Sequence, residues 1–361
     1  MTNRQRMAMA LACRPGLDCL PVLPWGLDAM ATPPDPSFAP LWRALLEKAV
    51  IKRRWTSWFD AFTPAPPVQV HTQPVRHSGS AWIEETALSG PGGELQQTVQ
   101  GIPGTTASEK TSHFLKTEDD IRLYLSWPFA AARVDVAPYF ELERSVGERG
   151  VVTYRLMDAL GVAGGNLAAE FLALLSVDNE PLLMRLIETL AERIHRHVQA
   201  LLEAGARPIF HVSGSEYATP PLLRPRQFDD YVMRFDQPLL ALMHRYGCKV
   251  LVHCHGRANG VLERFIDMGV DGLHPLEAPP MGDITLAEAE RRVGDKLCLV
   301  GNLQIGDMMR NEPSEIREQV LRIREDVPTG MILSTSATPY ETVLSQRLLE
   351  NYLVALDAAA E

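Results

Sequence analysis

The apolar residues of the C-terminal half form short runs that alternate with longer segments of helical periodicity. The apolar runs lie at 208–212, 250–255, 272–276, 297–300 and 331–334. Each run precedes a segment with helical spacing of its apolar residues, at 225–245, 258–268, 285–292, 313–325 and 341–359. The runs lack polar and apolar alternation, and strands buried on both faces are typical of a parallel sheet covered by helices. The pattern therefore predicts an α/β fold.

Elements further upstream extend this repeat. Residues 19–25 and 151–156 are predicted to be extended, and the first of these segments is a candidate first barrel strand. Helices are predicted at 2–14, 117–127, 136–147, 165–175 and 179–204, and the last of these has leucine, isoleucine and valine at spacings of three and four. With two or three upstream strands added, a (β/α)8 TIM barrel of residues 1–361 fits better than an open sheet.

Residues 33–116 do not follow the repeat and are predicted to be an N-terminal elaboration of the barrel domain. A helix is expected at 40–51, and two alternating segments around Ser-Gly-Pro-Gly-Gly predict a β-hairpin within 80–101. Trp55 and Trp58 belong to a proline-rich part of this elaboration, and we expect them to pack or to form part of a lid.

Composition restricts the kinds of partner. The formal net charge is -10 and no long block of Lys and Arg occurs, so a nucleic-acid partner is not expected. The N-terminal residues lack the apolar core of a signal peptide, and no uncharged apolar run is long enough for a membrane span. Five cysteines without CxxC spacing favour the reducing cytoplasm.

Polar side chains follow several predicted strands at the points where the strands end. His253 and His255 share one face at the end of their strand, whereas Cys254 points the other way and should pack. The carboxyl ends of parallel barrel strands meet at one mouth, where ligands bind. The expected mouth residues are Glu216, Tyr217, His253, His255, His274, Glu277, Asn302, Gln304, Ser334 and Ser336.

The two histidines allow two hypotheses. In the first, His253 and His255 hold zinc with Glu216 as a third ligand, and the open fourth position activates a bound water or thiol. In the second, both are neutral histidines that form hydrogen bonds with loops or substrate. An i, i+2 pair alone does not decide between these hypotheses, because two ligands do not define a tetrahedral site.

Other polar residues at the strand ends have alternative roles. Glu277 is a candidate general base, a partner that orients a histidine, or an acceptor for a substrate hydroxyl, and its structural alternative is an N-cap or ion pair. Asn302 is expected to position a ligand rather than to react. His211 lies in the middle of a strand and is expected to be a core residue with its hydrogen bonds satisfied.

The order of four segments in 208–352 resembles the uroporphyrinogen decarboxylase superfamily. These segments are the strand that ends in His-Cys-His-Gly256, Asp271-Gly-Leu-His-Pro-Leu-Glu277, the stretch 294–302 and the stretch 330–334. The resemblance implies a (β/α)8 barrel. The decarboxylases of this superfamily hold tetrapyrrole carboxylates with an arginine-rich N-terminal motif, but Trp25-Gly-Leu-Asp28 stands where that motif is expected.

The methyltransferase branch of the superfamily is more similar. Its members transfer methyl groups between a corrinoid, usually on a separate protein, and a thiol or tetrahydrofolate. The thiol-activating members hold zinc with a His-x-Cys pair and a later cysteine. His253 matches the histidine, but His255 replaces the first cysteine and the segment 334–338 contains no cysteine. The resemblance therefore implies either an altered zinc site or a site without metal that uses His253, His255 and Glu277.

These observations favour a cytoplasmic methyltransferase or demethylase with a small methylated or methoxylated substrate. The expected catalytic residues are His253, His255 and Glu277, and the expected substrate-binding residues are Tyr217, Asn302, Gln304 and Arg257. The resemblance implies tetrahydrofolate or a corrinoid protein as methyl acceptor, and a homodimer is a candidate assembly although no helix face is singled out.

Two other functions remain open. A cofactor-independent lyase that decarboxylates a small carboxylate requires a cation at the mouth, for which Arg224 and Arg257 are the nearest candidates by sequence. A non-catalytic family member is the third alternative.

Overall fold

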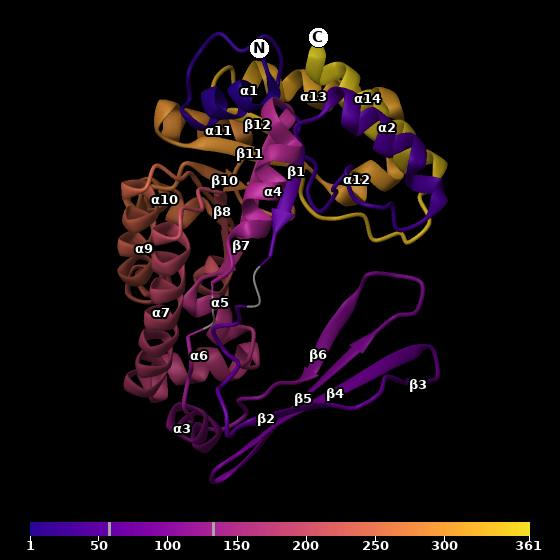
Figure 1. Cartoon of the computed structure of the whole chain (residues 1–361). Helices are drawn as coiled ribbons and strands as arrows, with labels where there is room; N and C mark the ends of the chain where they lie inside the picture. Colours follow the sequence, from indigo (N-terminus) through magenta and orange to yellow (C-terminus); the bar gives the residue numbers. More distant parts are fainter. Residues whose placement is uncertain (57–58, 132–133) are drawn as a thin grey trace.

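A parallel sheet of seven strands is the central feature of the computed structural model, which describes residues 1–56, 59–131 and 134–361 (Figure 1). The strands follow the order β1-β7-β8-β9-β10-β11-β12. Their bounds are β1 (Ile51–Trp55), β7 (Gly150–Met157), β8 (Ile209–Ser213), β9 (Val250–His253), β10 (Gly272–His274), β11 (Cys298–Leu303) and β12 (Met331–Thr335). The α/β class predicted from the repeated strand and helix units is confirmed.

The segment around Val22 connects the two edges of this sheet. Val22 forms a parallel bridge with Leu333 of β12, and the Leu23 amide donates to the Leu333 carbonyl at 2.8 Å. The Val50 amide, directly before β1, donates to the Val22 carbonyl at 2.9 Å. The candidate first strand at 19–25 is thus a single bridging position, and the curled sheet resembles a TIM barrel.

Helices cover the outer face of the sheet, as Figure 1 shows for α7, α9 and α10. The helices are α1 (Asn3–Leu11), α2 (Ala39–Lys48), α3 (Glu118–Ser126), α4 (Ala137–Val146), α5 (Ala159–Gly164), α6 (Ala169–Asp178), α7 (Glu180–Glu203), α8 (Pro225–Phe228), α9 (Arg234–Arg245), α10 (Leu262–Met268), α11 (Leu286–Val293), α12 (Ile305–Arg310), α13 (Pro313–Asp326) and α14 (Gln346–Ala360). The Asn179 side chain accepts from the Leu182 amide and caps α7, whose periodic apolar residues are all buried. No helix among the described residues is both long and apolar enough to cross a membrane.

The helix prediction was wrong for residues 49–51, and the strand that begins at Ile51 was not predicted. The helix predicted at 40–51 ends at Lys48, and Ile51–Trp55 forms strand β1 beside β7. Lys52 and Arg54 alternate with buried Ile51 and Trp55, so the charged side chains share one face of the strand. Trp55 is 2% exposed and packs against Tyr139 and Tyr154, which places it in the core, whereas Trp58 lies outside the described residues.

A second sheet forms the N-terminal elaboration, and we call it the arm. Its antiparallel strands are β2 (Gln69–Thr72), β3 (Arg76–Ser78), β4 (Ala81–Gly90), β5 (Gly93–Gly101) and β6 (Ser108–Ser112). The β4 and β5 pair confirms the predicted hairpin at 80–101, and the other three strands were not predicted. Figure 1 shows the arm extending away from the helices that cover the parallel sheet.

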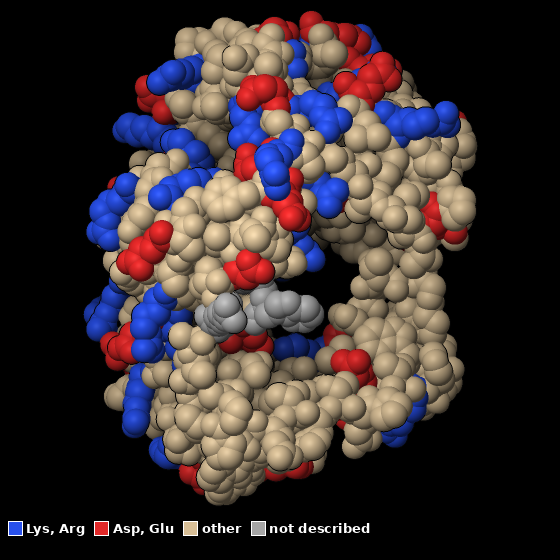
Figure 2. Space-filling view, viewed as in Figure 1, with Lys and Arg blue, Asp and Glu red and all other residues tan. Residues whose placement is uncertain are grey.

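The arm contacts loops on two sides of the strand ends. The Thr342 hydroxyl donates to the Gly104 carbonyl at 2.9 Å, and Thr105 bridges Glu341 in the loop after β12. On the other side, the Leu115 amide donates to the Asn166 carbonyl at 3.0 Å. Figure 2 shows an opening between the arm and the rest of the molecule, with Lys and Arg side chains along part of its margin.

The interior face of the curled sheet changes from apolar to polar along the strands. The apolar layer contains Met7, Leu11, Leu23, Val151, Leu251, Val300 and Ile332, with the first two contributed by α1. Polar residues follow toward the strand ends: the registers pair Arg155 with His211, His253 with His274 and Asn302 with Ser334. The Trp25 ring stacks on all three histidines, so they form one polar layer. This polar layer lies at the carboxyl ends of the strands, where the candidate site is expected.

Candidate active site

His255 and Glu277 form an ion pair beyond the ends of β9 and β10. His255 Nδ1 lies 3.2 Å from Glu277 Oε2, and the same carboxylate oxygen accepts the Gly256 amide at 2.9 Å. The Glu277 side chain is 6% exposed, whereas that of His255 is 41% exposed. The Glu277 carboxylate is therefore buried and bound by the Gly256 amide, whereas the His255 imidazole is partly exposed to solvent.

The charges around this pair favour a protonated imidazole. Burial alone would lower the pKa of His255, but the hydrogen bond and charge of Glu277, together with the charge of Glu216, raise that pKa above its ordinary value. Burial would likewise raise the pKa of Glu277, yet its bonds to His255 and the Gly256 amide lower it. Burial raises the pKa of Glu216, whose Oε2 accepts the Gly214 amide at 3.0 Å.

A cavity of about 790 Å³ opens beside the pair. Four of its polar residues come from the loops after β9, β10, β11 and β12, and they are His255, Glu277, Gln304 and Ser336. Asn302 belongs to β11 itself. Gln304 Nε2 is buried and makes no hydrogen bond of normal geometry among the described residues, although its amide helps to lower the pKa of Glu277. The cavity thus offers a proton donor, a carboxylate and an amide with a free N–H to a polar ligand.

His253 lies deeper than His255, beneath the ring of Trp25. The Trp25 ring stacks on His253 at 4.3 Å and on His274 at 4.2 Å between ring centroids. Lys52 Nζ lies 4.9 Å from the Trp25 ring centroid. His253 is 8% exposed, so it forms part of the layer below the cavity rather than its lining.

Hydrogen bonds fix the tautomers of the buried histidines. His274 Nε2 lies 3.0 Å from the Thr335 carbonyl oxygen, which only accepts, so this nitrogen carries the proton. His274 Nδ1 then accepts, and His253 Nδ1 donates to it at 2.8 Å. Burial lowers the pKa of His253 to about 3 and that of His274 well below its ordinary value, so both rings are neutral at pH 7.

The arrangement does not fit the zinc site considered from the sequence. The rings of His253 and His255 are near one another, with centroids 4.6 Å apart, but His255 is paired with Glu277 and Glu216 binds its own loop. The described residues contain no group of three or more His, Cys, Asp or Glu side chains placed to hold a metal ion. The residues present therefore do not fit a bound zinc ion.

The structure separates other residues that the sequence placed together. Tyr217 lines a different cavity, which it shares with Lys110 of the arm, and Arg257 and Arg224 are exposed and line none of the described cavities around the strand ends. His211 is buried as expected, but its Nε2 has no hydrogen-bond partner among the described residues. The expectation of a satisfied core histidine was therefore wrong. Cys254 is 2% exposed and packs, as expected.

The sequence did not single out four residues that surround the mouth. Trp25 covers the imidazole layer, and Lys52, Arg54 and Arg155 line a cavity of about 440 Å³ with it. The available signal was the i, i+2 spacing of Lys52 and Arg54 between apolar Ile51 and Trp55. It was missed because residues 52–55 were assigned to a proline-rich elaboration and not to a strand.

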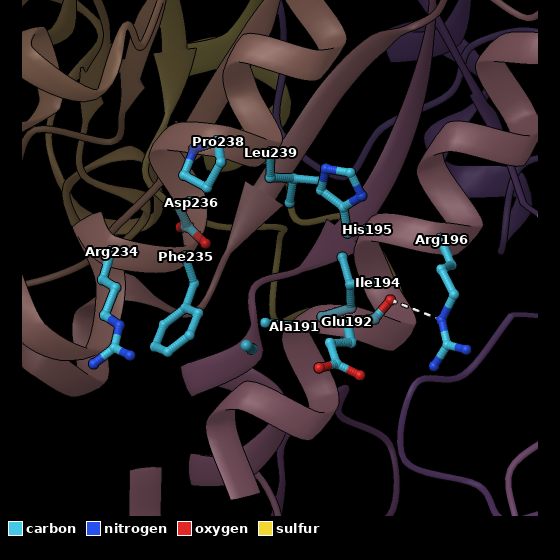
Figure 3. A pocket seen from close by; sticks show the side chains of 11 residues that line it. Ala191, Glu192, Ile194, His195, Arg196, Arg234, Phe235, Asp236, Pro238 and Leu239 are labelled. Carbon is cyan, nitrogen blue, oxygen red and sulfur yellow. Dashed lines mark hydrogen bonds between the residues drawn. The ribbon is translucent and has the colours of Figure 1, made fainter. Parts of the chain in front are cut away.

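A further cavity of about 440 Å³ lies outside the sheet, between α7 and α9. Figure 3 shows Asp236 beside Phe235 and Pro238, with Arg234 and Arg196 at opposite sides of the pocket. Asp236 is 3% exposed, and burial raises its pKa. Asp158, the N-cap of α5, is 1% exposed and has its pKa raised by burial and by the charge of Asp236. The two carboxyl groups thus share a buried region in which one negative charge opposes another.

We expect the effect of Asp236→Asn on the free energy of unfolding, measured against the wild type, to be more favourable at pH 8 than at pH 5. A carboxyl group with a raised folded-state pKa favours folding at low pH, and this contribution is lost as the pH rises from the unfolded value through the folded one. The difference in unfolding free energy between variant and wild type should therefore grow by on the order of 1 kcal/mol over this range. Urea unfolding at both pH values measures it, and an equal difference at both would contradict the assignment.

Comparisons with known proteins are consistent with this geometry. The family model described as uroporphyrinogen decarboxylase (URO-D) matches residues 162–343. The chain is 29% identical over 150 residues to the uroporphyrinogen decarboxylase of Pseudoalteromonas translucida (strain TAC 125), and 28% identical over 156 residues to that of Aliivibrio salmonicida (strain LFI1238). These matches cover 40% and 42% of this chain and 39% of each relative, so the chain spans about two fifths of the curated relatives it matches.

A solved structure is similar over the whole chain. It is described as a methyltransferase from Methanosarcina mazei, with a TM-score of 0.62 and 16% sequence identity. The superposition covers 99% of this chain and 98% of that protein. At this identity the similarity supports the fold, including the N-terminal elaboration.

Proposed function

Because the chain belongs to the uroporphyrinogen decarboxylase (URO-D) family, we propose that it is a methyltransferase-like enzyme of that family, which removes a methyl group from a small methylated or methoxylated compound. The observation that carries this proposal is the ion pair of His255 and Glu277 at 3.2 Å in the wall of the cavity above the strand ends. The likeness of the whole chain to a protein described as a methyltransferase supports the same class.

His255 is proposed to supply the proton that demethylation needs. When the bond between the methyl carbon and the substrate heteroatom breaks, the bonding electrons stay on the heteroatom, which takes a proton. The raised pKa of His255 keeps the imidazole protonated near neutral pH, and Glu277 stabilises that charge and holds the ring. Asn302 and the unpaired N–H of Gln304 are placed to orient the substrate.

The methyl acceptor is proposed to be tetrahydrofolate or a corrinoid, either of which supplies the nucleophile for the methyl group. The contribution of this chain is to bind the substrate, to protonate the leaving heteroatom and to limit access of water. The arm and the loop after β12, which are joined through Thr105 and Glu341, border the entrance. A screen of methylated compounds with each acceptor, followed by mass spectrometry of the demethylated product, tests this function.

A decarboxylase is the second candidate, favoured by the cationic residues Lys52, Arg54 and Arg155 near the mouth and by relatives that are described as decarboxylases. Such an enzyme would release CO2 from a small carboxylate without any methyl acceptor. The same screen distinguishes the two functions, because turnover with release of CO2 in the absence of both acceptors supports the decarboxylase. Turnover that requires an acceptor supports the methyltransferase.

We expect purified protein to contain much less than one equivalent of zinc per chain. The described residues provide no group of three metal ligands, and two histidines with separate partners bind zinc weakly. Inductively coupled plasma mass spectrometry after growth with added zinc measures the content. Stoichiometric zinc that disappears in His255→Ala would contradict the metal-free site.

A further inference from the structure

A cavity of about 440 Å³ beside the reaction site has an excess of positive charge. Lys52 and Arg54 reach it from β1, and Arg155 reaches it from β7. The register places Arg54 opposite Thr153 and Arg155 opposite His211, so these side chains project from the same face of adjacent strands. Three cationic side chains therefore converge on one water-accessible space.

The protein does not neutralise these charges itself. Asp28 is the acidic residue in the lining, and its carboxylate lies 3.1 Å from Arg53 Nε on the neighbouring side of β1. Among the described residues neither Arg54 nor Arg155 has an acidic side chain within ion-pair distance. Burial and the nearby Arg54 charge lower the pKa of Arg155, although the charge of Glu216 opposes them, and burial, offset in part by Asp28, lowers the pKa of Lys52 to about 8. Like charges held together in this way favour a bound anion.

The cavity also contains a buried ring nitrogen that has no hydrogen-bond partner among the described residues. His211 is 6% exposed and borders this cavity, and its buried Nε2 has no hydrogen-bond partner among the described residues. Hydroxyl groups of Thr56, Thr153 and Thr338 complete the polar lining, and Trp25 forms an apolar wall. A ligand with oxygen atoms would satisfy the imidazole and the guanidinium groups together.

This cavity lies next to the one that contains His255 and Glu277. Ser336 and Ala337 line the reaction cavity, and the next residue, Thr338, lines the cationic cavity. Trp25 borders the cationic cavity and stacks on His253, whose ring is 4.6 Å from that of His255. The two cavities are therefore neighbours, joined in the chain by the segment 336–338.

We propose that Lys52, Arg54 and Arg155 bind the doubly negative end of a small ligand, either a phosphate monoester or a pair of carboxylates. Three positive charges, of which Arg54 and Arg155 have no ion-pair partner among the described residues, match two negative charges better than one. The assignment of the opposite end of the ligand to His255 and Glu277 rests on the proposed function, whereas binding of the anion does not. The anion belongs either to the methylated substrate or to the glutamate group of a folate acceptor.

Isothermal titration calorimetry at low, constant ionic strength tests the proposal with inorganic phosphate and glutarate as probes. We expect both anions to bind the wild type, and Arg54→Gln and Arg155→Gln each to weaken binding about tenfold or more. Arg257→Gln is the matched control, because it removes the same charge from an exposed residue outside the cavity. Arg155→Lys, which keeps the charge, should bind better than Arg155→Gln and guards against loss of folding.

Thermal unfolding provides a second measure. Without anion, Arg155→Gln should unfold at the same or a higher temperature than the wild type, because it removes repulsion. Equal responses of wild type, Arg155→Gln and Arg257→Gln to both anions would overturn the proposal, as would a failure of both anions to bind.

Folic acid and pteroic acid, which differ by the glutamate group, identify the source of the anion. If folic acid binds the wild type more tightly than pteroic acid does, and Arg155→Gln abolishes the difference, the cavity binds the acceptor. If the two compounds bind equally while phosphate or glutarate binds the wild type, the cavity binds the substrate. None of these measurements needs turnover. If the protein binds no anion, the proposed role of His255 and Glu277 is not affected. If the protein binds anions but is inactive, only the proposed reaction is disproved.

Discussion

Replacement of His255 by alanine is expected to lower kcat by a factor of about 10² to 10⁴, the usual contribution of a positioned general acid. The imidazole is half exposed to the cavity and is held by Glu277 at 3.2 Å, so it is placed to protonate a leaving group. Steady-state assays with the substrate found in the screen measure the change. His195→Ala is the matched control, because that histidine lies in the pocket between α7 and α9, and it should retain wild-type activity.

The pH profile distinguishes this role from a merely structural one. The acid form of His255 is the active form, so activity should be constant at low pH and fall as the pH passes its raised pKa, above the ordinary value of 6.5. Glu277→Gln retains the shape of the side chain but removes its charge, and the fall in activity should then occur at lower pH. An unchanged profile in this variant, or full activity of His255→Ala, would exclude the proposed proton donor.

The second large effect is expected for Trp25→Ala, which should lower the free energy of unfolding by about 3 kcal/mol. The ring covers His253 and His274 with centroid distances of 4.3 and 4.2 Å, and its removal leaves a cavity above the polar layer. Water then reaches His253, whose pKa should rise from about 3 toward the ordinary histidine value.

Urea unfolding and NMR titration of the histidine ring protons measure these two effects. Trp25→Phe is the control, because a smaller aromatic ring retains part of the stacking and should lose much less stability. If Trp25→Ala were as stable as Trp25→Phe and left the His253 titration unchanged, the indole would not cover the imidazole layer in solution.

The sequence predicted the C-terminal half of the fold because local patterns determine it. Each apolar run there is a strand buried on both faces, and helix α7 follows from the spacing of its leucines. Strand β1 was missed because Lys52, Arg53 and Arg54 read as polar, and their tolerance in a strand depends on a water-accessible cavity that only the assembled sheet creates.

The candidate site was predicted in part for a similar reason. Strand alternation placed His253 and His255 on one face, and adjacent strand ends brought Glu277 to His255. Two residues along a strand also differ by about 7 Å in depth, so His253 lies in the layer under Trp25 while His255 reaches the cavity. The position of Trp25 depends on contacts between distant segments, which no local pattern encodes.

The position of the arm bears on which form of the methyl acceptor can approach the strand ends. Contacts of Gly104 with Thr342 and of Leu115 with Asn166 fix the arm to the rest of the chain at two places, beside the opening seen in Figure 2. For the reaction proposed above, an acceptor carried on a separate protein would have to approach past the arm and the loop after β12, whereas a free small molecule would bring no second protein to that margin.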